Sequence, residues 1–263
     1  MKKLLITLLV IGLALSAQSI AGAVNIPQGT VSFHWTSWET RVTKVGDVLN
    51  GIFRLDQILD GSNNIIWNSG GSEELTGTFS GLSVSTFGGE FPGSHIGFTG
   101  GSLKVYQDTT PDFAPGFPGS GVTDGSLWLD LAFVTGGNFF FPADTLTSFV
   151  TGAGADPEAK LSIFGTGSGL LDVVGGSAAS MFDSNTYPRL DGSGLNADMS
   201  LSANFYIRDT GVFPFVNPKD GWPVWNKDPI GAKAVPEPTS MLLLGMGMFG
   251  LAAKKGLKRK KAA

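Results

Sequence analysis

The chain has 263 residues, with 18 basic and 22 acidic side chains and no cysteine. The absence of cysteine excludes disulfides and thiolate metal sites, so the protein must form its core by packing alone. Eight of the basic residues but only one of the acidic residues lie in residues 1–23 and 235–263, which leaves residues 24–234 with a net charge of about −11. This charge argues against a nucleic-acid-binding protein, because such proteins need a general basic field.

Residues 1–23 have the pattern of a secretory signal peptide. Lys2 and Lys3 provide a positive start, an apolar stretch follows over residues 4–17, and Ala21 and Ala23 form an A-x-A cleavage site. The sequence therefore predicts an exported protein whose mature chain begins at Val24.

The body, residues 24–216, predicts an all-β domain. Apolar and polar residues alternate over residues 31–36, 127–134 and 197–208, and further strands are predicted at 48–59 and 64–67, on either side of a turn. Such alternation is typical of antiparallel sheets with one buried face.

The remaining body segments are turns, loops and short helices in this prediction. Residues 100–102, Gly-Gly-Ser, predict a hairpin between strands at 95–99 and 103–107. Three prolines and three glycines make residues 109–121 a surface loop, and short helical turns are expected at 144–150 and 177–182. The best fit is a single antiparallel β-sandwich or jelly-roll-like domain, with a barrel or a β-solenoid as alternatives. The proline-rich residues 217–234 are interpreted as a linker.

The C-terminal segment, residues 235–261, has three parts in a fixed order. It begins with Val235, Pro236, Glu237 and Pro238, where the prolines hold the chain extended in a shape that a protease groove can bind. An apolar run of 13 residues, 241–253, follows and is expected to form a short hydrophobic helix, although a full membrane span needs about 20 residues. The segment ends with the basic residues Lys254, Lys255, Lys258, Arg259, Lys260 and Lys261, which the positive-inside rule keeps in the cytoplasm.

This three-part tail resembles the PEP-CTERM sorting signal of bacterial exported proteins. The resemblance implies recognition by an exosortase, a membrane protease, with a transient stay in the inner membrane of a Gram-negative bacterium. It further implies release to the cell surface or to a matrix rich in exopolysaccharide. Residues 169–183 resemble a segment of other β-rich exported proteins of unassigned activity. An ordinary C-terminal membrane anchor is the alternative interpretation of the tail.

Candidate ligand sites in the body are sparse. Asp60, Ser62 and Asn64 space their oxygens like the start of a calcium loop, but turn chemistry explains the same residues. Trp222 and Trp225 flank a proline and are the candidates for stacking on a sugar. No metal site is assigned, and calcium is the only cofactor that these residues suggest.

Catalytic patterns are equally sparse. His34 and His95 are not at metal-ligand spacing and are interpreted as structural. Neighbouring carboxylates such as Glu73 and Glu74 point to opposite faces of a strand and are expected at the solvated surface. We therefore expect a surface or extracellular-matrix protein with a structural or binding role and no enzymatic activity. The alternatives are a carbohydrate-binding, lectin-like module and, with less support, a secreted polysaccharide hydrolase.

Overall fold

The computed structural model describes residue 24, residues 26–209 and residues 218–235. The expected signal-peptide cleavage site, Pro236 to Pro238 of the sorting motif, the apolar run and the basic tail lie outside this part of the chain. The described residues are mostly β-strand, and every pairing between them is antiparallel. The expected antiparallel all-β class is thus confirmed.

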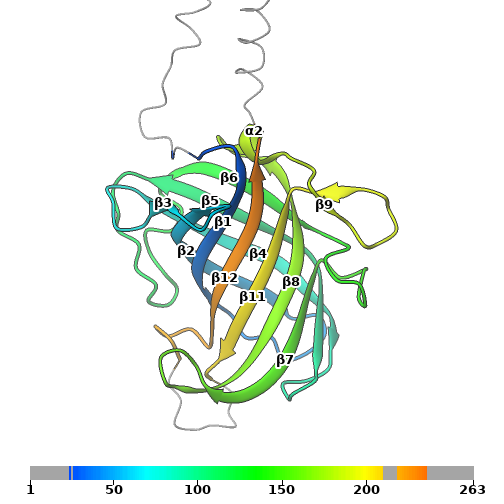
Figure 1. Ribbon diagram of the computed structural model, residues 1–263. Helices are drawn as coiled ribbons and strands as arrows, with labels where there is room; N and C mark the ends of the chain where they lie inside the picture. Colours follow the sequence, from blue (N-terminus) through cyan, green and yellow to red (C-terminus); the bar gives the residue numbers. More distant parts are fainter. Residues whose placement is uncertain (1–23, 25, 210–217, 236–263) are drawn as a thin grey trace, which may run out of the picture.

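The strands run through the body from residue 29 to residue 234 (Figure 1). Their bounds are β1 Gly29–Glu39, β2 Val48–Asp60, β3 Ile65–Asn68, β4 Glu74–Phe87, β5 His95–Asp108, β6 Ser126–Val134, β7 Leu146–Ala155, β8 Leu161–Gly175, β9 Tyr187–Pro188, β10 Asn196–Ala197, β11 Met199–Ile207 and β12 Val224–Ala234. One short helix, α2, spans Ala179–Phe182. No helix in the described ranges has the length and apolar character needed to cross a membrane.

The main sheet closes on itself. Its strands follow the order β1-β12-β11-β8-β6-β5-β4-β2, and β1 also pairs with β2, which joins the two ends of the path. Strand β7 pairs with β5 and β8, as β6 does, so β6 and β7 occupy the same place in the ring at different heights. The result is a closed cylinder of strands rather than the two facing sheets of the expected sandwich (Figure 1).

The predicted hairpin at residues 100–102 is wrong. Gly100 and Gly101 have φ of 71° and 103°, but β5 passes through them as one strand, and Gly100 remains paired with Leu82 of β4. The glycines therefore bend the strand without reversing it, as is common where a sheet coils into a closed form.

Two other local predictions also differ from the structure. Residues 144–150, expected as a helical turn, contain the start of β7, whereas the turn expected at 177–182 is confirmed by α2. The expected linker, residues 217–234, contains β12, which is paired with β1 on one side and β11 on the other. Pro229 is tolerated because the pairing with β11 is interrupted between Asn226 and Ile230.

The two ends of the cylinder differ. Gly29 at the start of β1 pairs with Ala234 at the end of β12, and α2 contacts β12 at this same end. We call this end the α2 pole; it therefore holds both ends of the described chain (Figure 1). The opposite end, where Glu39 pairs with Val224, is the far pole.

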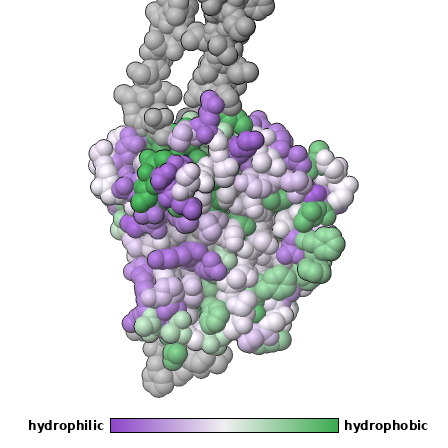
Figure 2. All heavy atoms as spheres, in the orientation of Figure 1, coloured by the Kyte–Doolittle hydropathy of each residue, from purple (hydrophilic) through white to green (hydrophobic). Residues whose placement is uncertain are grey.

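Aromatic residues fill the cylinder near the α2 pole. Phe182 of α2 is fully buried, and its ring lies 5.4 Å from that of Phe33 and 5.7 Å from that of Trp128, both edge to face. The outside carries polar residues over much of the face shown in Figure 2, with apolar residues mainly towards its edges. This division matches the alternation of the strands, since one side of each strand faces inward.

Candidate functional site

A cavity lies inside the cylinder, between the aromatic core and the far pole. Residues of several strands line it, among them Trp35, Ser37, Glu39, Ser148, Ala203 and Asn226. Its volume is about 50 Å³, which is more than the roughly 10–15 Å³ that one water molecule needs. The cavity is thus a place where water or a small molecule can enter the core.

The polar residues of the cavity are brought together by strand register. Ser37 of β1 lies opposite Asn226 of β12, and Glu39 is two residues further along β1 on the same face. Ser37 Oγ donates a hydrogen bond of 3.0 Å to Glu39 Oε1, and Asn226 Nδ2 donates to the same oxygen. Both partners hold the buried carboxylate in one position.

Two buried polar atoms of this cavity's lining residues have no hydrogen-bond partner. They are the indole nitrogen of Trp35, a donor, and Oδ1 of Asn226, an acceptor. Each residue is only 5% exposed. The amide orientation of Asn226 follows from its neighbour, because the nitrogen must face the Glu39 carboxylate. Buried polar groups are nearly always paired, so these two atoms mark a place where a hydrogen-bonding molecule would be stabilised.

A second cavity, also of about 50 Å³, lies nearer the far pole. It shares Glu39, Leu49, Ser148 and Phe205 with the first cavity, and Arg41 lines it. Arg41 forms a two-bond ion pair with Glu90, with nitrogen–oxygen distances of 2.9 and 2.5 Å. The hydrogen bond with Glu90 raises the pKa of Arg41 above its usual value, so this residue of the cavity wall stays charged.

The structure does not support the two tryptophans proposed for sugar stacking. Trp222 and Trp225 are only 5% and 2% exposed, and they pack with Trp38 and Ile52 in a small cluster outside the main core. The indole nitrogen of Trp222 donates to the carbonyl of Pro115 at 2.8 Å. Burial leaves neither ring a face for a sugar, because the expected linker folds back as β12 and the adjoining turn.

The calcium candidates form a turn. The carboxylate of Asp60 accepts hydrogen bonds from the backbone of Ser62 and Asn64 and from the side chain of Asn64, at 2.8 to 2.9 Å. The side-chain hydrogen bond from Asn64, supported by the backbone bonds, lowers the pKa of Asp60. The arrangement is a self-contained Asx turn, which is the alternative that the sequence left open.

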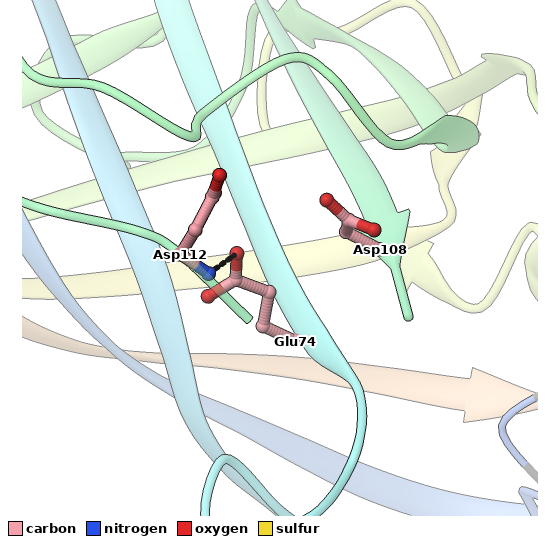
Figure 3. A group of neighbouring side chains, drawn as sticks. All are labelled: Glu74, Asp108 and Asp112. Atoms are coloured by element: carbon pink, nitrogen blue, oxygen red, sulfur yellow. Dashed lines mark hydrogen bonds between the residues drawn. The ribbon is translucent and has the colours of Figure 1, made fainter. Parts of the chain in front are cut away.

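A group of three carboxylates lies beside the loop 109–121. Glu74, Asp108 and Asp112 have oxygens within 4.8 Å of one another (Figure 3). Glu74 is only 4% exposed, which contradicts its expected place at the solvated surface. Its carboxylate accepts hydrogen bonds from the backbone nitrogens of Asp112 and Phe113. Glu74 thus anchors the loop, and this task accounts for its burial.

Both histidines have local partners. His34 hydrogen-bonds to Ser32 at 2.9 Å. His95 Nε2 lies 3.0 Å from Asp144, and its ring stacks on Phe141 with centroids 3.6 Å apart. Asp144 and Phe141 fix the His95 ring at the start of β5, where His95 pairs with Phe149 of β7, in agreement with the structural role expected from the sequence.

Sequence reasoning missed the cavity. A usable signal was present in β1, where the inward series Val31, Phe33 and Trp35 continues with the polar residues Ser37 and Glu39. A change from apolar to polar on the inward face predicts a hydrated or ligand-holding region. Asn226 had no such signal, because its segment was interpreted as a linker.

Comparison with known proteins identifies the C-terminal segment. The comparison shows that this chain is an exported protein that is sorted through its C-terminus. More specifically, residues 234–259 match the PEP-CTERM protein-sorting motif, which marks the chain as an exosortase substrate. The match begins at Ala234, the last residue of β12. Neither the curated proteins nor the solved structures gave a match.

Proposed function

We propose that this protein is an exported surface or extracellular-matrix protein whose closed β body is processed by exosortase and then acts passively, by structure or by binding. The observation that carries the proposal is the sorting motif at residues 234–259. The proposed sequence of events is export, a transient stay in the inner membrane, cleavage near Pro236 to Pro238, and retention at the surface or in an exopolysaccharide matrix.

The fold supports this order of events. Because β1 and β12 are antiparallel neighbours, both ends of the body leave at the α2 pole. A body held at the membrane by its C-terminal segment would therefore present its far pole, with Arg41 and Glu90, away from the bilayer. The sorting motif follows β12 without an intervening linker, so cleavage after Val235 would leave the cylinder complete.

A non-enzymatic role remains part of this proposal. His95, Glu74 and Asp60 are each committed to local structural contacts. The lectin-like alternative is weakened because Trp222 and Trp225, its two candidates for sugar stacking, are buried. Its calcium-assisted form is weakened because the Asp60 carboxylate is hydrogen-bonded within a turn. A matrix hydrolase would need two carboxylates facing each other across a substrate cleft. No observation on the described residues favours it over the passive role.

The test is an intact-mass measurement and a C-terminal peptide analysis of the protein recovered from the producing bacterium. We expect a chain that begins near Val24 and ends between Val235 and Thr239. In a strain without exosortase, the same measurement should find residues 241–261 still attached. Recovery of the uncut tail from cells with active exosortase would instead establish an ordinary membrane anchor.

A further inference from the structure

We propose that a second copy of this chain binds to an apolar ledge on the side wall of the cylinder, so that copies held in one membrane pair side by side. The ledge is the exposed surface of Phe139 and Phe140, in the loop after β6, and of Leu190 and Leu195, in the β9–β10 hairpin. This inference names a partner for the passive role, and its membrane-held state rests on the proposed function.

The four residues of the ledge are well exposed for apolar side chains. Phe139 and Phe140 are 73% and 79% exposed, and Leu190 and Leu195 are 49% and 58% exposed. Figure 2 shows apolar side chains gathered at the right-hand edge of the molecule, where the loop after β6 and the β9–β10 hairpin project from the cylinder. Two neighbouring aromatic rings held in solvent are typical of a docking surface.

The loop that carries the two phenylalanines is held in place. Asn138 Oδ1 accepts hydrogen bonds from the backbone nitrogens of Phe140 and Phe141 at 2.9 and 3.3 Å. The ring of Phe141 stacks on His95, so one of the three consecutive phenylalanines anchors the loop while the other two stay exposed. A loop that is already fixed loses little conformational entropy on binding, which favours association.

Hydrogen bonds join this loop to the hairpin. The backbone nitrogen of Leu190 donates to the carbonyl oxygen of Gly136 at 3.0 Å. The guanidinium of Arg189 donates to the carbonyl oxygen and to the hydroxyl of Thr135, at 3.1 and 2.7 Å. The loop and the hairpin therefore form one surface.

The ledge carries no net charge. Arg189 and Asp191 are the only charged residues in segments 135–142 and 187–196. They pair with each other at 3.0 Å, and their side chains are only 14% and 13% exposed. The body as a whole has a net charge of about −11, so two copies approach with little repulsion where the local charge is balanced.

The ledge lies halfway along the side wall. Strand β8 ends next to α2, and its middle residue Gly169 pairs with Leu146 at the start of β7. At the other end of the loop, Val134 of β6 pairs with the adjacent Leu170. Copies held at the α2 pole thus present their ledges at the same height. A twofold axis along the cylinder joins two ledges and leaves both tails pointing towards the membrane.

The area of the ledge fits a weak dimer. A phenylalanine buries roughly 150–250 Å² when covered, so the exposed parts of Phe139 and Phe140 amount to about 300 Å² per copy. Two facing ledges, with the leucines added, approach the roughly 1,000 Å² that a specific interface requires. Pairing should therefore be weak between free copies and stronger between copies confined to one membrane, where the effective concentration is higher.

The first test is sedimentation equilibrium of the released protein recovered from the producing cells, over a range of concentrations. We expect a reversible equilibrium between monomer and dimer. Phe140→Ser should weaken the dimer about tenfold, as expected for a central aromatic contact. Phe91→Ser is the matched control, because this ring is 62% exposed in the loop after β4, and it should leave the dimer unchanged. Thermal unfolding should be the same for both variants.

The second test uses the uncut protein in cells without exosortase. The chain has no cysteine, so a short bis-maleimide can link single introduced cysteines. Leu195→Cys should cross-link to a second copy severalfold more than Val45→Cys, which is 60% exposed near the far pole. Adding Phe140→Ser should remove most of this difference.

The proposal is overturned if Leu195→Cys and Val45→Cys cross-link equally in membrane-held protein, or if Phe140→Ser and Phe91→Ser have the same effect on association. If the released protein is monomeric throughout, the cross-link decides, and equal cross-linking would assign the ledge to a different partner. If the uncut tail does not hold the protein at the membrane, the proposed function falls. Sedimentation of the released protein then decides the pairing by itself.

Discussion

The carboxyl group of Asp172 in β8 lies close to the buried carboxylate of Asp198. Burial, followed by the charge of Asp198, raises the pKa of Asp172 above its usual value. Its Oδ1 atom has no hydrogen-bond partner, whereas Asp198 accepts bonds from the backbone of Val173, Ser184 and Asn185. The two neighbouring acids therefore differ in role. Asp198 holds three backbone segments in place through its hydrogen bonds, whereas the charged form of Asp172 is destabilised by its surroundings.

Asp172→Asn should stabilise the protein at pH 7 by a few tenths to about 1 kcal/mol, because it removes a partly buried charge beside Asp198. A raised folded-state pKa means that this group's contribution to stability is complete below the unfolded pKa of about 3.9 and is lost as the pH rises through the folded pKa. The gain should therefore disappear near pH 3. Thermal unfolding at both pH values measures it, with exposed Asp124→Asn as the control that changes little.

Asp191 shows the opposite behaviour. Its carboxylate accepts hydrogen bonds from Ser193 and Thr135 and lies 3.0 Å from Arg189. The bond with the Ser193 side chain, then that with Thr135, holds the pKa of Asp191 well below its usual range. This one side chain thus joins the segment before β10 to the end of β6.

Asp191→Asn should lower the melting temperature at pH 7 by a few degrees, because it weakens charge-assisted hydrogen bonds. A lowered folded-state pKa gives stability that is present above the unfolded pKa and is lost as the pH falls through the folded pKa. The difference between the variant and the unmodified chain should therefore shrink on acidification towards pH 2. A difference that stayed constant over this range would show that the charge of Asp191 contributes nothing.

At the scale of the elements, glycines opposite phenylalanines allow the strands to pack closely. Gly77 pairs with Phe53, Gly51 with Phe79, and Gly165 with Phe205. A Cβ atom added at Gly77 would come within 2.3 Å of the Phe53 ring and closer still to the Lys104 carbonyl oxygen. Each of these rings covers the backbone of the neighbouring strand.

Gly77→Ala should destabilise the protein by about 3 kcal/mol, because the Lys104 backbone cannot move aside as a flexible side-chain end could. Gly154→Ala in β7 is the matched control, since its nearest neighbour would lie at 3.5 Å. Denaturant unfolding of both variants gives the comparison. Equal losses of stability would contradict the close packing assigned to Gly77.

The last strand, β12, is an essential part of the ring. A chain that ends at Pro223 would leave β1 and β11 with unpaired edges, which favour aggregation. We expect that chain to lose cooperative unfolding, whereas a chain that ends at Val235 should keep it. Circular dichroism with thermal unfolding distinguishes the two, and a folded chain ending at Pro223 would restore the interpretation of residues 217–234 as a linker.

At the scale of the whole molecule, the position of the two chain ends sets an orientation. The sequence has no cysteine, so single cysteines can report on each pole. Val45 in the loop after β1 is 60% exposed near the far pole, and Ser180 is exposed on α2. These two positions sample opposite ends of the cylinder.

In cells without exosortase, a bulky thiol reagent should label Val45→Cys severalfold faster than Ser180→Cys, because the uncut tail holds the α2 pole near the bilayer. After release from the membrane, the two rates should become similar, which provides the control. Equal rates on uncut, membrane-held protein would contradict the proposed orientation.

The sequence alone predicted a large part of the fold. In β11, the alternation of Met199, Leu201 and Phe205 with polar residues gave the correct inward face. Alternation reports only that one face of a strand is buried, and this holds equally for a sandwich and for a closed cylinder. The closure depends on the pairing of β1 with β12, and these two strands lie at opposite ends of the body sequence. Local turn chemistry likewise could not show that Gly100 and Gly101 bend β5 instead of ending it.

The functional features of the protein were likewise predictable from the sequence only in part. The sequence by itself determined the sorting of this protein, because a motif such as Pro236 to Pro238 is read in order along the chain and requires no fold. Only the tertiary structure decided that β12 completes the ring, that Trp225 is buried, and that Trp35 and Asn226 line one cavity. Those facts depend on register between strands separated by nearly two hundred residues, and no local pattern encodes such a pairing.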